Sequence, residues 1–262
     1  MDHQRLLDAA SDDPDASGGV GAEDLGPDVR VPKYFSLKEV LTERIRNLPA
    51  GTALPPEREL VSEFRASRTT VRQALKDLAA EGRVVRMHGR GTFVAPPKET
   101  ISLQLLSYTE EWTRLGRTPS SRLVGLDRVA ASPEAATALD VASGTPLLRI
   151  ERIRLTDGAP MAVEVAHLEA ERFDGLETLI DEGVSLYALL EQRWGVVPQT
   201  AEQTFETAMA TPALATALGT DAGTPLILLN RRTVGVDGRP FEYVRAHYRG
   251  DRYRFVSNLS RP

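Results

Sequence analysis

Two arginines near the middle of the chain have the spacing of an anion-binding pair. Arg152 and Arg154 lie in the run LLRIERIRL, which reads as a β-strand. Alternate residues of a strand project from one face, so both guanidiniums continue the face that begins with Leu148 and Ile150. Arginine binds phosphate and carboxylate groups through paired hydrogen bonds. The pair therefore indicates an anion site, with a solvated sheet surface as the alternative.

Residues 67–82, SRTTVRQALKDLAAEG, predict a helix with one polar side. At 100° per residue, the apolar residues share the opposite side, and these are Val71, Ala74, Leu75, Leu78 and Ala79. The polar side carries Thr69, Arg72, Gln73 and Lys76, with Arg68 and Thr70 beside them in the first turn. A helix in the major groove reads bases with its N-terminal residues, and arginine to guanine is the commonest specific contact. This side indicates DNA binding, with an ordinary solvated helix surface as the alternative.

The segments around this helix complete a DNA-binding fold. SLKEVLTERIRNL predicts a first helix that begins with Ser36 and Glu39 as a capping box. Its apolar residues at helical spacing are Leu37, Val40, Leu41, Ile45 and Leu48. PPERELVSEF predicts a shorter second helix, Ser67 caps the third, and RVVRMHGRGTFVA predicts two short strands around a turn. Three helices followed by a hairpin indicate a winged helix-turn-helix.

Charge is unevenly distributed along the chain. The net charge is −5, but residues 31–96 hold 12 basic and 7 acidic side chains, whereas residues 1–30 hold 2 basic and 8 acidic ones. A basic block within an acidic chain is typical of a nucleic-acid-binding module. The acidic, unpatterned start is expected to be a disordered tail. The chain has no cysteine and no apolar run of the roughly 20 residues that span a membrane, so a cytoplasmic protein is expected.

The second half of the chain contains an internal repeat. SPEAATALDVASGTPLLRIERIRL aligns with TPALATALGTDAGTPLILLNRRTV at an offset of 79, which pairs Arg152 with Arg231. DGAPMAVEVAHL then aligns with DGRPFEYVRAHY at an offset of 80. Each unit predicts a helix followed by a β-hairpin. Two units are expected to form one antiparallel sheet with helices on one face, an α+β fold. No catalytic or metal-binding motif occurs, so no enzyme, metal or cofactor is predicted.

Residues 31–96 resemble the N-terminal domain of GntR-family bacterial transcription regulators, through the segments PPERELV and SRTTVRQAL. The resemblance implies DNA contacts from the arginine of the ERE segment, from the start of the third helix and from the wing tip. At the matching positions these residues are Arg58, Arg68, Thr69, Thr70, Arg72, His88, Gly89, Arg90 and Gly91. An ion pair within its own helix is the alternative for Arg58, and a tight turn is the alternative for the glycines.

Residues 103–262 resemble the UTRA effector domain of the HutC-type branch of that family, through SYTEEW, ERIRL, SLYALL and YRGDRYRF. This domain is similar in fold to chorismate lyase but serves as a sensor. In sugar-phosphate-sensing relatives, matching residues hold the phosphate, and here these are Ser107, Arg152, Arg154, Ser185 and Tyr187. Matching positions that meet sugar hydroxyl or amino groups are Glu164, Glu242 and Tyr248. A helix N-cap is the alternative for Ser185, and a sheet-surface charge is the alternative for Glu164.

Together these features predict a tail at 1–30, a winged helix-turn-helix at 31–96, a linker at 97–102 and a UTRA effector-binding and dimerisation domain at 103–262. The predicted protein is a homodimeric repressor that reads a near-palindromic operator and answers to a phosphorylated amino sugar. Glucosamine 6-phosphate and N-acetylglucosamine 6-phosphate are the leading candidates for the effector, because the motif set looks like that of regulators of N-acetylglucosamine use. An organic acid such as urocanate is the runner-up. The rivals are an architectural DNA-binding protein whose second domain only dimerises and an enzyme carrying a DNA-binding domain.

Overall fold

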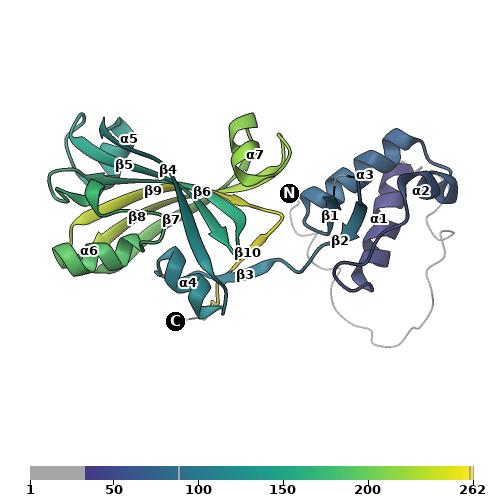
Figure 1. Cartoon of the computed structure of the whole chain (residues 1–262), viewed down its shortest axis with the longest axis horizontal. Helices are drawn as coiled ribbons and strands as arrows, with labels where there is room; N and C mark the ends of the chain where they lie inside the picture. The colour runs from purple at the N-terminus through teal and green to yellow at the C-terminus, as the bar shows by residue number, and fades with distance from the viewer. Residues whose placement is uncertain (1–32, 88, 260, 262) are drawn as a thin grey trace, which may run out of the picture.

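The computed structural model describes residues 33–87, 89–259 and 261. These residues form a helical domain and a larger domain built on a β-sheet, joined by an extended segment (Figure 1). The expected tail, residues 1–30, lies outside the described residues. Across the described part of the chain, no helix has the length and hydropathy needed to cross a membrane.

The helical domain has the predicted order of elements. They are α1 (Lys33–Arg46), α2 (Glu57–Phe64), α3 (Arg68–Ala80), β1 (Val84–Met87) and β2 (Gly91–Val94). The two strands pair in antiparallel fashion. One core of buried side chains from all five elements holds them together, including Leu41, Leu60, Leu75, Val84 and Val94. The predicted winged helix-turn-helix is therefore confirmed.

The first helix differs from its prediction at two positions. α1 already includes Lys33, so Ser36 lies inside the helix and is not its N-cap. Val40, which was expected to be buried, is 45% exposed. The buried stripe of α1 runs through Leu37 and Leu41, and at 100° per residue Val40 lies to one side of it.

The larger domain contains a six-stranded sheet with strand order β4-β5-β6-β9-β8-β7. The strands are β4 (Pro119–Ala130), β5 (Pro146–Thr156), β6 (Ala159–Glu169), β7 (Pro198–Met209), β8 (Pro225–Gly235) and β9 (Pro240–Arg249). Every neighbouring pair is antiparallel. The helices of this domain are α4 (Tyr108–Arg114), α5 (Pro133–Leu139), the short 3-10 helix η2 (Leu176–Thr178), α6 (Leu186–Trp194) and α7 (Pro212–Leu218). This is the predicted α+β fold.

The internal repeat is visible in the topology. The units β4-α5-β5-β6 and β7-α7-β8-β9 meet where β6 pairs with β9, at the centre of the sheet. Each unit therefore begins one strand earlier than the sequence alignment indicated.

The prediction that helices cover one face of the sheet is wrong. Helix α6 packs on the face that carries Leu148 and Ile150, whereas α5 packs against Leu147 and α7 against Ile153 on the other face (Figure 1). The reason lies in β5, which has buried apolar residues on both of its faces and needs cover on both.

The connection between the domains is partly a strand. Residues 99–102, expected to belong to a linker, form β3 (Glu99–Ser102), which pairs in parallel with β10 (Tyr253–Val256). A small core that includes Ile101, Trp112 and Tyr253 joins this pair to α4 and the sheet. The C-terminal strand therefore fixes the point at which the chain enters the larger domain.

Candidate functional site

Helix α3 presents its polar side outward. The Ser67 side chain accepts a hydrogen bond from the Thr70 backbone N–H, which caps the helix as predicted. The apolar side is buried through Val71, Ala74, Leu75 and Leu78. The exposed residues of the helix include Arg68, Thr69, Arg72, Gln73 and Lys76. The helical projection from sequence is therefore correct.

Glu57, at the start of α2, holds two arginines beside this helix. Its carboxylate lies 2.8 Å from Arg72 Nε and 3.7 Å from Arg86 Nη2. The Arg72 side chain is still 66% exposed, so the contact orients the guanidinium without burying it. Arg58 is 83% exposed and lies 3.8 Å from Glu59, which is beyond hydrogen-bond distance. The alternative role of Arg58 amounts to a loose contact.

The wing between β1 and β2 has an open tip. Gly89 and Gly91 have φ of +70° and +113°, a region that favours glycine. A Cβ at either position would meet nothing within 4 Å, so the same glycines permit the turn and leave the backbone accessible. Arg90 is exposed between them. His88, predicted with this group, lies outside the described residues.

All eight residues expected to bind an effector line one cavity in the larger domain. They are Ser107, Arg152, Arg154, Glu164, Ser185, Tyr187, Glu242 and Tyr248. They come from the start of α4, from β5 and β6, from the start of α6 and from β9. The cavity encloses about 40 Å³. Segments that are far apart in sequence thus meet on the face of the sheet that α6 covers.

The two arginines of β5 are buried, and each is 3% exposed. Arg152 Nη2 donates to Glu164 Oε1 at 2.5 Å, and Arg154 Nη1 lies 3.9 Å from the same oxygen. The alternative of a solvated sheet surface is therefore wrong. Among the described residues, Nε and Nη1 of both arginines have no hydrogen-bond partner. Buried donors normally have acceptors, so these four donor nitrogens suit an anion with several oxygens.

The two glutamates of the cavity differ in their preferred charge. Burial opposes ionisation of Glu164, but Arg154 and Arg152 outweigh it and lower the pKa of this carboxyl group. Burial raises the pKa of Glu242, and the neighbouring charge of Glu164 raises it further. Glu242 also accepts a 2.8 Å hydrogen bond from the Tyr187 hydroxyl. Because Glu164 is only 8% exposed, the alternative of a sheet-surface charge is wrong.

The two serines of the cavity are engaged differently. The Ser107 hydroxyl accepts a hydrogen bond from the Glu110 backbone N–H at 3.2 Å, and the Glu110 carboxylate accepts one from the Ser107 N–H at 2.8 Å. This capping box fixes the start of α4. Ser185 occupies the N-cap position of α6, but its side chain makes no capping hydrogen bond. Its hydroxyl at the cavity wall can therefore serve a ligand.

Sequence reasoning missed Arg231, which also lines the cavity. This residue lies on β8, and its Nε donates to Gln203 Oε1 of β7 at 2.7 Å. The repeat alignment carried the signal, because Arg231 is the counterpart of Arg152 at an offset of 79. Since the two halves meet at the centre of the sheet, equivalent strands bring both arginines to one cavity.

Tyr108 also lines the cavity, and it belongs to the SYTE segment from which sequence reasoning singled out only Ser107. Its ring centre lies 4.4 Å from the guanidinium carbon of Arg154, a cation–π contact. Its hydroxyl is 2.7 Å from Thr156 Oγ1. Burial raises the pKa of Tyr108 to about 12, so it remains a neutral hydroxyl at pH 7. On the same helix, burial raises the pKa of Glu111 to about 7 against the opposing charge of Arg231.

Comparison with known proteins covers both domains. Residues 33–94 match the bacterial regulatory proteins of the gntR family, and residues 114–254 match the UTRA domain. The chain is 37% identical over 234 residues to the HTH-type transcriptional repressor NagR of Bacillus subtilis (strain 168), across 88% of this chain and 96% of the relative. It is 32% identical to the histidine utilization repressor of Pseudomonas putida, across 88% and 93% respectively. The crystal structure of PhnF from Mycobacterium smegmatis has a TM-score of 0.61 and 37% identity, across 86% of this chain and 99% of that one.

These relatives are transcription repressors, which agrees with a DNA-binding regulator and not with an enzyme. The helix-turn-helix of residues 33–94 is accordingly a DNA-binding domain, and the sheet domain corresponds to the UTRA domain. The chain belongs to the GntR family of bacterial regulatory proteins and carries a UTRA domain as its second part.

Proposed function

We propose that this protein is a homodimeric repressor of amino-sugar metabolism whose operator binding answers to a sugar phosphate. Glucosamine 6-phosphate and N-acetylglucosamine 6-phosphate are the leading effectors. The observation that carries the proposal is the pair of buried arginines, because Nε and Nη1 of Arg152 and Arg154 lack protein acceptors among the described residues. A phosphate group supplies several oxygens to guanidiniums held on one strand face.

The charge of the cavity favours a dianion. Three guanidiniums, those of Arg152, Arg154 and Arg231, line it, and arginine stays protonated in proteins. Against them stands the ionised Glu164, whereas the raised pKa of Glu242 favours the neutral acid. The three guanidiniums outnumber the two carboxyl groups of the lining, so the lining carries an excess of positive charge. A phosphate monoester carries a charge of about −1.5 to −2 at pH 7, whereas a carboxylate carries only −1.

The remaining polar groups suit the sugar. Glu164 and Glu242 reach the cavity from different repeats, and carboxyl oxygens accept hydrogen bonds from hydroxyl and amino groups. An ammonium group beside Glu242 would lower the pKa of this carboxyl group and favour its ionised form. Tyr187, Tyr248 and the serine hydroxyls complete a polar lining. The resemblance of the whole motif set to regulators of N-acetylglucosamine use supports the same class of ligand.

Effector binding must open the cavity. The enclosed space of about 40 Å³ is far below the roughly 300–1,000 Å³ of typical small-ligand pockets, so a hexose phosphate needs a wider cavity. Two contacts join residues of the lining across the cavity elements, one between Tyr187 and Glu242 and one between Arg154 and Tyr108. Binding is therefore expected to separate these pairs and to displace α4 or α6, and α4 follows directly on the interdomain strand β3.

The DNA side of the proposal follows from the exposed start of α3 and from the wing. Arg68, Arg72 and Arg90 are exposed together with Arg58, as residues that contact bases and phosphates must be. A dimer that places two such helices one DNA turn or more apart reads a near-palindromic operator.

Isothermal titration calorimetry of the full chain tests the effector. Glucosamine 6-phosphate and N-acetylglucosamine 6-phosphate are expected to bind, glucosamine is expected not to, and Arg152→Ala is expected to abolish binding while DNA binding persists. Arg122→Ala removes an exposed arginine of β4 and serves as the matched control. Urocanate, an organic acid with one carboxylate, is the competing ligand. Tight binding of urocanate together with no heat from any sugar phosphate would overturn the proposal.

A further inference from the structure

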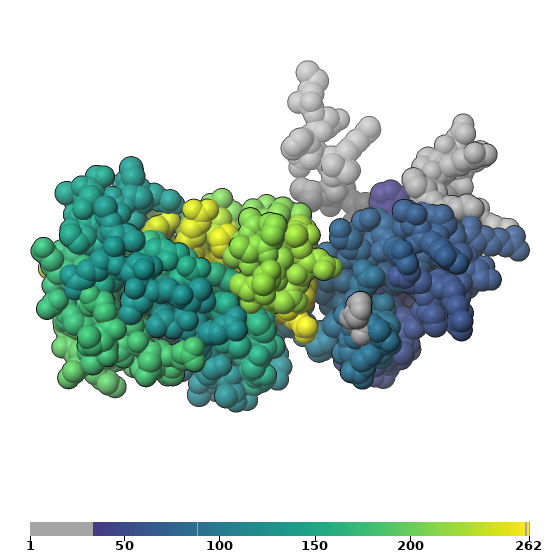
Figure 2. Space-filling model, turned by 45° about the horizontal axis from the view of Figure 1, so that its top comes forward, coloured from purple at the N-terminus to yellow at the C-terminus, as the bar shows by residue number. Residues whose placement is uncertain are grey.

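Two segments of the UTRA domain lie against the DNA-binding domain, at the C-terminal end of α3. One is the β9–β10 turn, residues 249–252, and the other is the α7–β8 loop, residues 219–224. Both line a cleft of about 520 Å³ together with residues of α3 and β1. In the space-filling view, the lime-coloured region around α7 adjoins the blue DNA-binding domain (Figure 2).

Gly82 and the turn lie close together. A Cβ on Gly82 would lie 2.0 Å from the backbone carbonyl oxygen of Asp251, a distance at which either residue 82 or the turn has to move. Gly82 directly follows the cap of α3 and has a φ of +73°. The residue that follows the C-cap of α3 is therefore also the residue that allows the turn to come this near.

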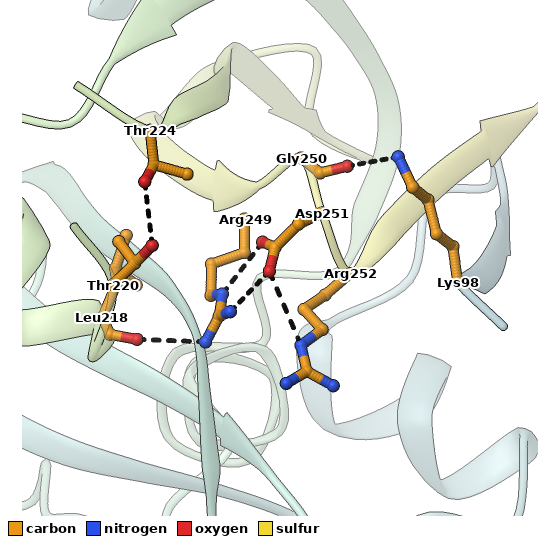
Figure 3. Close-up of polar contacts among 8 residues, drawn as sticks. All are labelled: Lys98, Leu218, Thr220, Thr224, Arg249, Gly250, Asp251 and Arg252. Atoms are coloured by element: carbon orange, nitrogen blue, oxygen red, sulfur yellow. Dashed lines mark hydrogen bonds and ion pairs between the residues drawn. The ribbon is translucent and has the colours of Figure 1, made fainter. Parts of the chain in front are cut away.

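Internal contacts hold the turn in shape (Figure 3). The Arg249 guanidinium donates to both carboxylate oxygens of Asp251, at 3.0 and 2.5 Å, and to the Leu218 carbonyl at the end of α7, at 3.2 Å. Lys98 Nζ, from the segment before β3, donates to the Gly250 carbonyl at 2.7 Å. Arg249 and Asp251 side chains are only 12% and 11% exposed. Side-chain hydrogen bonds therefore fix the conformation of the turn.

The cleft lies over part of the DNA-reading surface. Gln73 and Lys76, from the polar side of α3, line it opposite Thr220, Asp221 and Thr224. Asp221 also lines a second cleft with the wing residues Arg86 and Arg90. Because Asp221 and its loop face α3 across one cleft and the wing across the other, a duplex lying on the polar side of α3 and the wing would meet that loop. An acidic side chain therefore stands beside the basic surface that would face DNA phosphates.

We propose that the β9–β10 turn and the α7–β8 loop form a docking surface for the DNA-binding domain of the same chain, and that the docked arrangement excludes DNA. Gly82 is the contact that makes docking possible, and Asp221 is the acidic group that opposes DNA phosphates. The surface is continuous with the cavity, because Tyr248 of the cavity lining directly precedes Arg249 and its ring centre lies 4.8 Å from that of Tyr253 after the turn. Docking rests on these contacts and does not depend on which ligand fills the cavity.

Gly82→Ala tests the contact, with Gly51→Ala as its matched control. Gly51 lies in the same domain with a φ of +83°, and a Cβ there would meet nothing within 4 Å, so the two variants share the backbone cost and differ in the clash. The probe is a duplex that the wild-type chain selects from a random pool, at one fixed salt concentration. If only undocked protein binds DNA, the apparent affinity for DNA is reduced in proportion to the undocked fraction. Gly82→Ala raises that fraction and is expected to tighten DNA binding about fivefold or more. Gly51→Ala is expected to leave the affinity for DNA unchanged.

Spin-label distances report docking without DNA or effector. The chain has no cysteine, so nitroxides can be attached specifically at Glu39→Cys on α1 and Gln192→Cys on α6, both of which are exposed. Gly82→Ala is expected to shift or broaden the interdomain distance distribution relative to the Gly51→Ala protein. Identical distributions and identical DNA affinities for the two glycine variants would overturn the proposal.

A variant in the UTRA domain tests docking without altering the sequence of the DNA-binding domain, so an effect on DNA affinity cannot come from a distorted α3. Asp221→Asn leaves the DNA-binding domain untouched and is expected to tighten DNA binding about two- to fivefold, the size of one exposed ionic contact. Glu191→Gln makes the same charge change on α6, at the far end of the UTRA domain (Figure 1), and is expected to leave the affinity unchanged. Equal effects of the two charge variants would show only general electrostatics and would refute docking through Asp221.

Discussion

Arg152 and Arg231 occupy the same position in two halves of a duplicated unit, yet their surroundings differ. Arg152 pairs with the ionised Glu164, whereas Arg231 is held by the neutral amide of Gln203. Arg231 therefore adds a positive charge to the cavity lining that its amide partner does not neutralise. This residue is expected to set the preference of the cavity for a doubly charged ligand.

Two ligands of equal shape and different charge test that role. Glucosamine 6-sulfate replaces the phosphate ester of glucosamine 6-phosphate with a monoanion, and the wild-type chain is expected to prefer the phosphate. Arg231→Gln should reduce the ratio of phosphate affinity to sulfate affinity by about tenfold, or about 1.4 kcal/mol. Arg231→Lys should keep most of that ratio. Calorimetry with both ligands measures the ratio. Equal weakening of both ligands by Arg231→Gln would mean that Arg231 only supports the cavity wall.

At the scale of elements, α2, α3 and the wing act as one DNA-facing unit. Glu57 of α2 contacts Arg72 of α3 and Arg86 of β1, so three elements position one basic cluster. The Arg72 guanidinium can leave this exposed ion pair at small cost, since solvent screens such pairs and they contribute little. We expect the same residue to read a base edge, and we expect Arg90 at the wing tip to meet a phosphate.

These roles predict different losses on mutation. Arg72→Ala is expected to weaken specific binding by about 1–3 kcal/mol and to relax the sequence preference at one position. Arg90→Ala is expected to weaken binding to all duplexes alike and to reduce the slope of log affinity against log salt by about 1. Arg46→Ala is the control, because it removes an exposed arginine at the end of α1 that is not among the expected DNA contacts. Fluorescence anisotropy over a salt series measures both effects, and wild-type specificity in Arg72→Ala would rule out the proposed reading face.

At the scale of the whole molecule, the two domains have separate cores. The core of α1, α2, α3 and the wing shares no residue with the clusters of the sheet domain. The domains meet through β3 and through the contact of Gly82 with the β9–β10 turn. Independent cores imply that a ligand of the cavity stabilises mainly one of them.

Thermal unfolding checks this expectation. Glucosamine 6-phosphate at 100 times its dissociation constant should add about 2.7 kcal/mol to the stability of the UTRA domain. Both tryptophans, Trp112 and Trp194, lie in that domain, so their fluorescence follows its unfolding alone, while circular dichroism follows both domains. The fluorescence transition should move to higher temperature, and the transition of the helical domain should stay in place. Arg152→Ala should remove the shift, and an equal shift of both transitions would contradict independent unfolding.

Local patterns determined much of this protein. The order of three helices and a wing, the Ser67 cap and the outward side of α3 follow from neighbouring residues, because helix periodicity and capping act over a few positions. The face shared by Arg152 and Arg154 and the internal repeat were also readable, since strand alternation and duplication are properties of the chain itself.

Other features depended on which distant segments cover each face. The pairing of β6 with β9 brings Arg231 to the cavity of Arg152. Residues at the starts of α4 and α6 line the same cavity, in which Arg152 and Arg154 are buried. The strand pattern alone could not decide between a buried site and a solvated sheet surface for these two arginines. The cover on both faces of the sheet and the approach of Asp251 to Gly82 arise in the same way. Contacts between residues so far apart in the chain leave no periodic signal, so only the tertiary structure decided them.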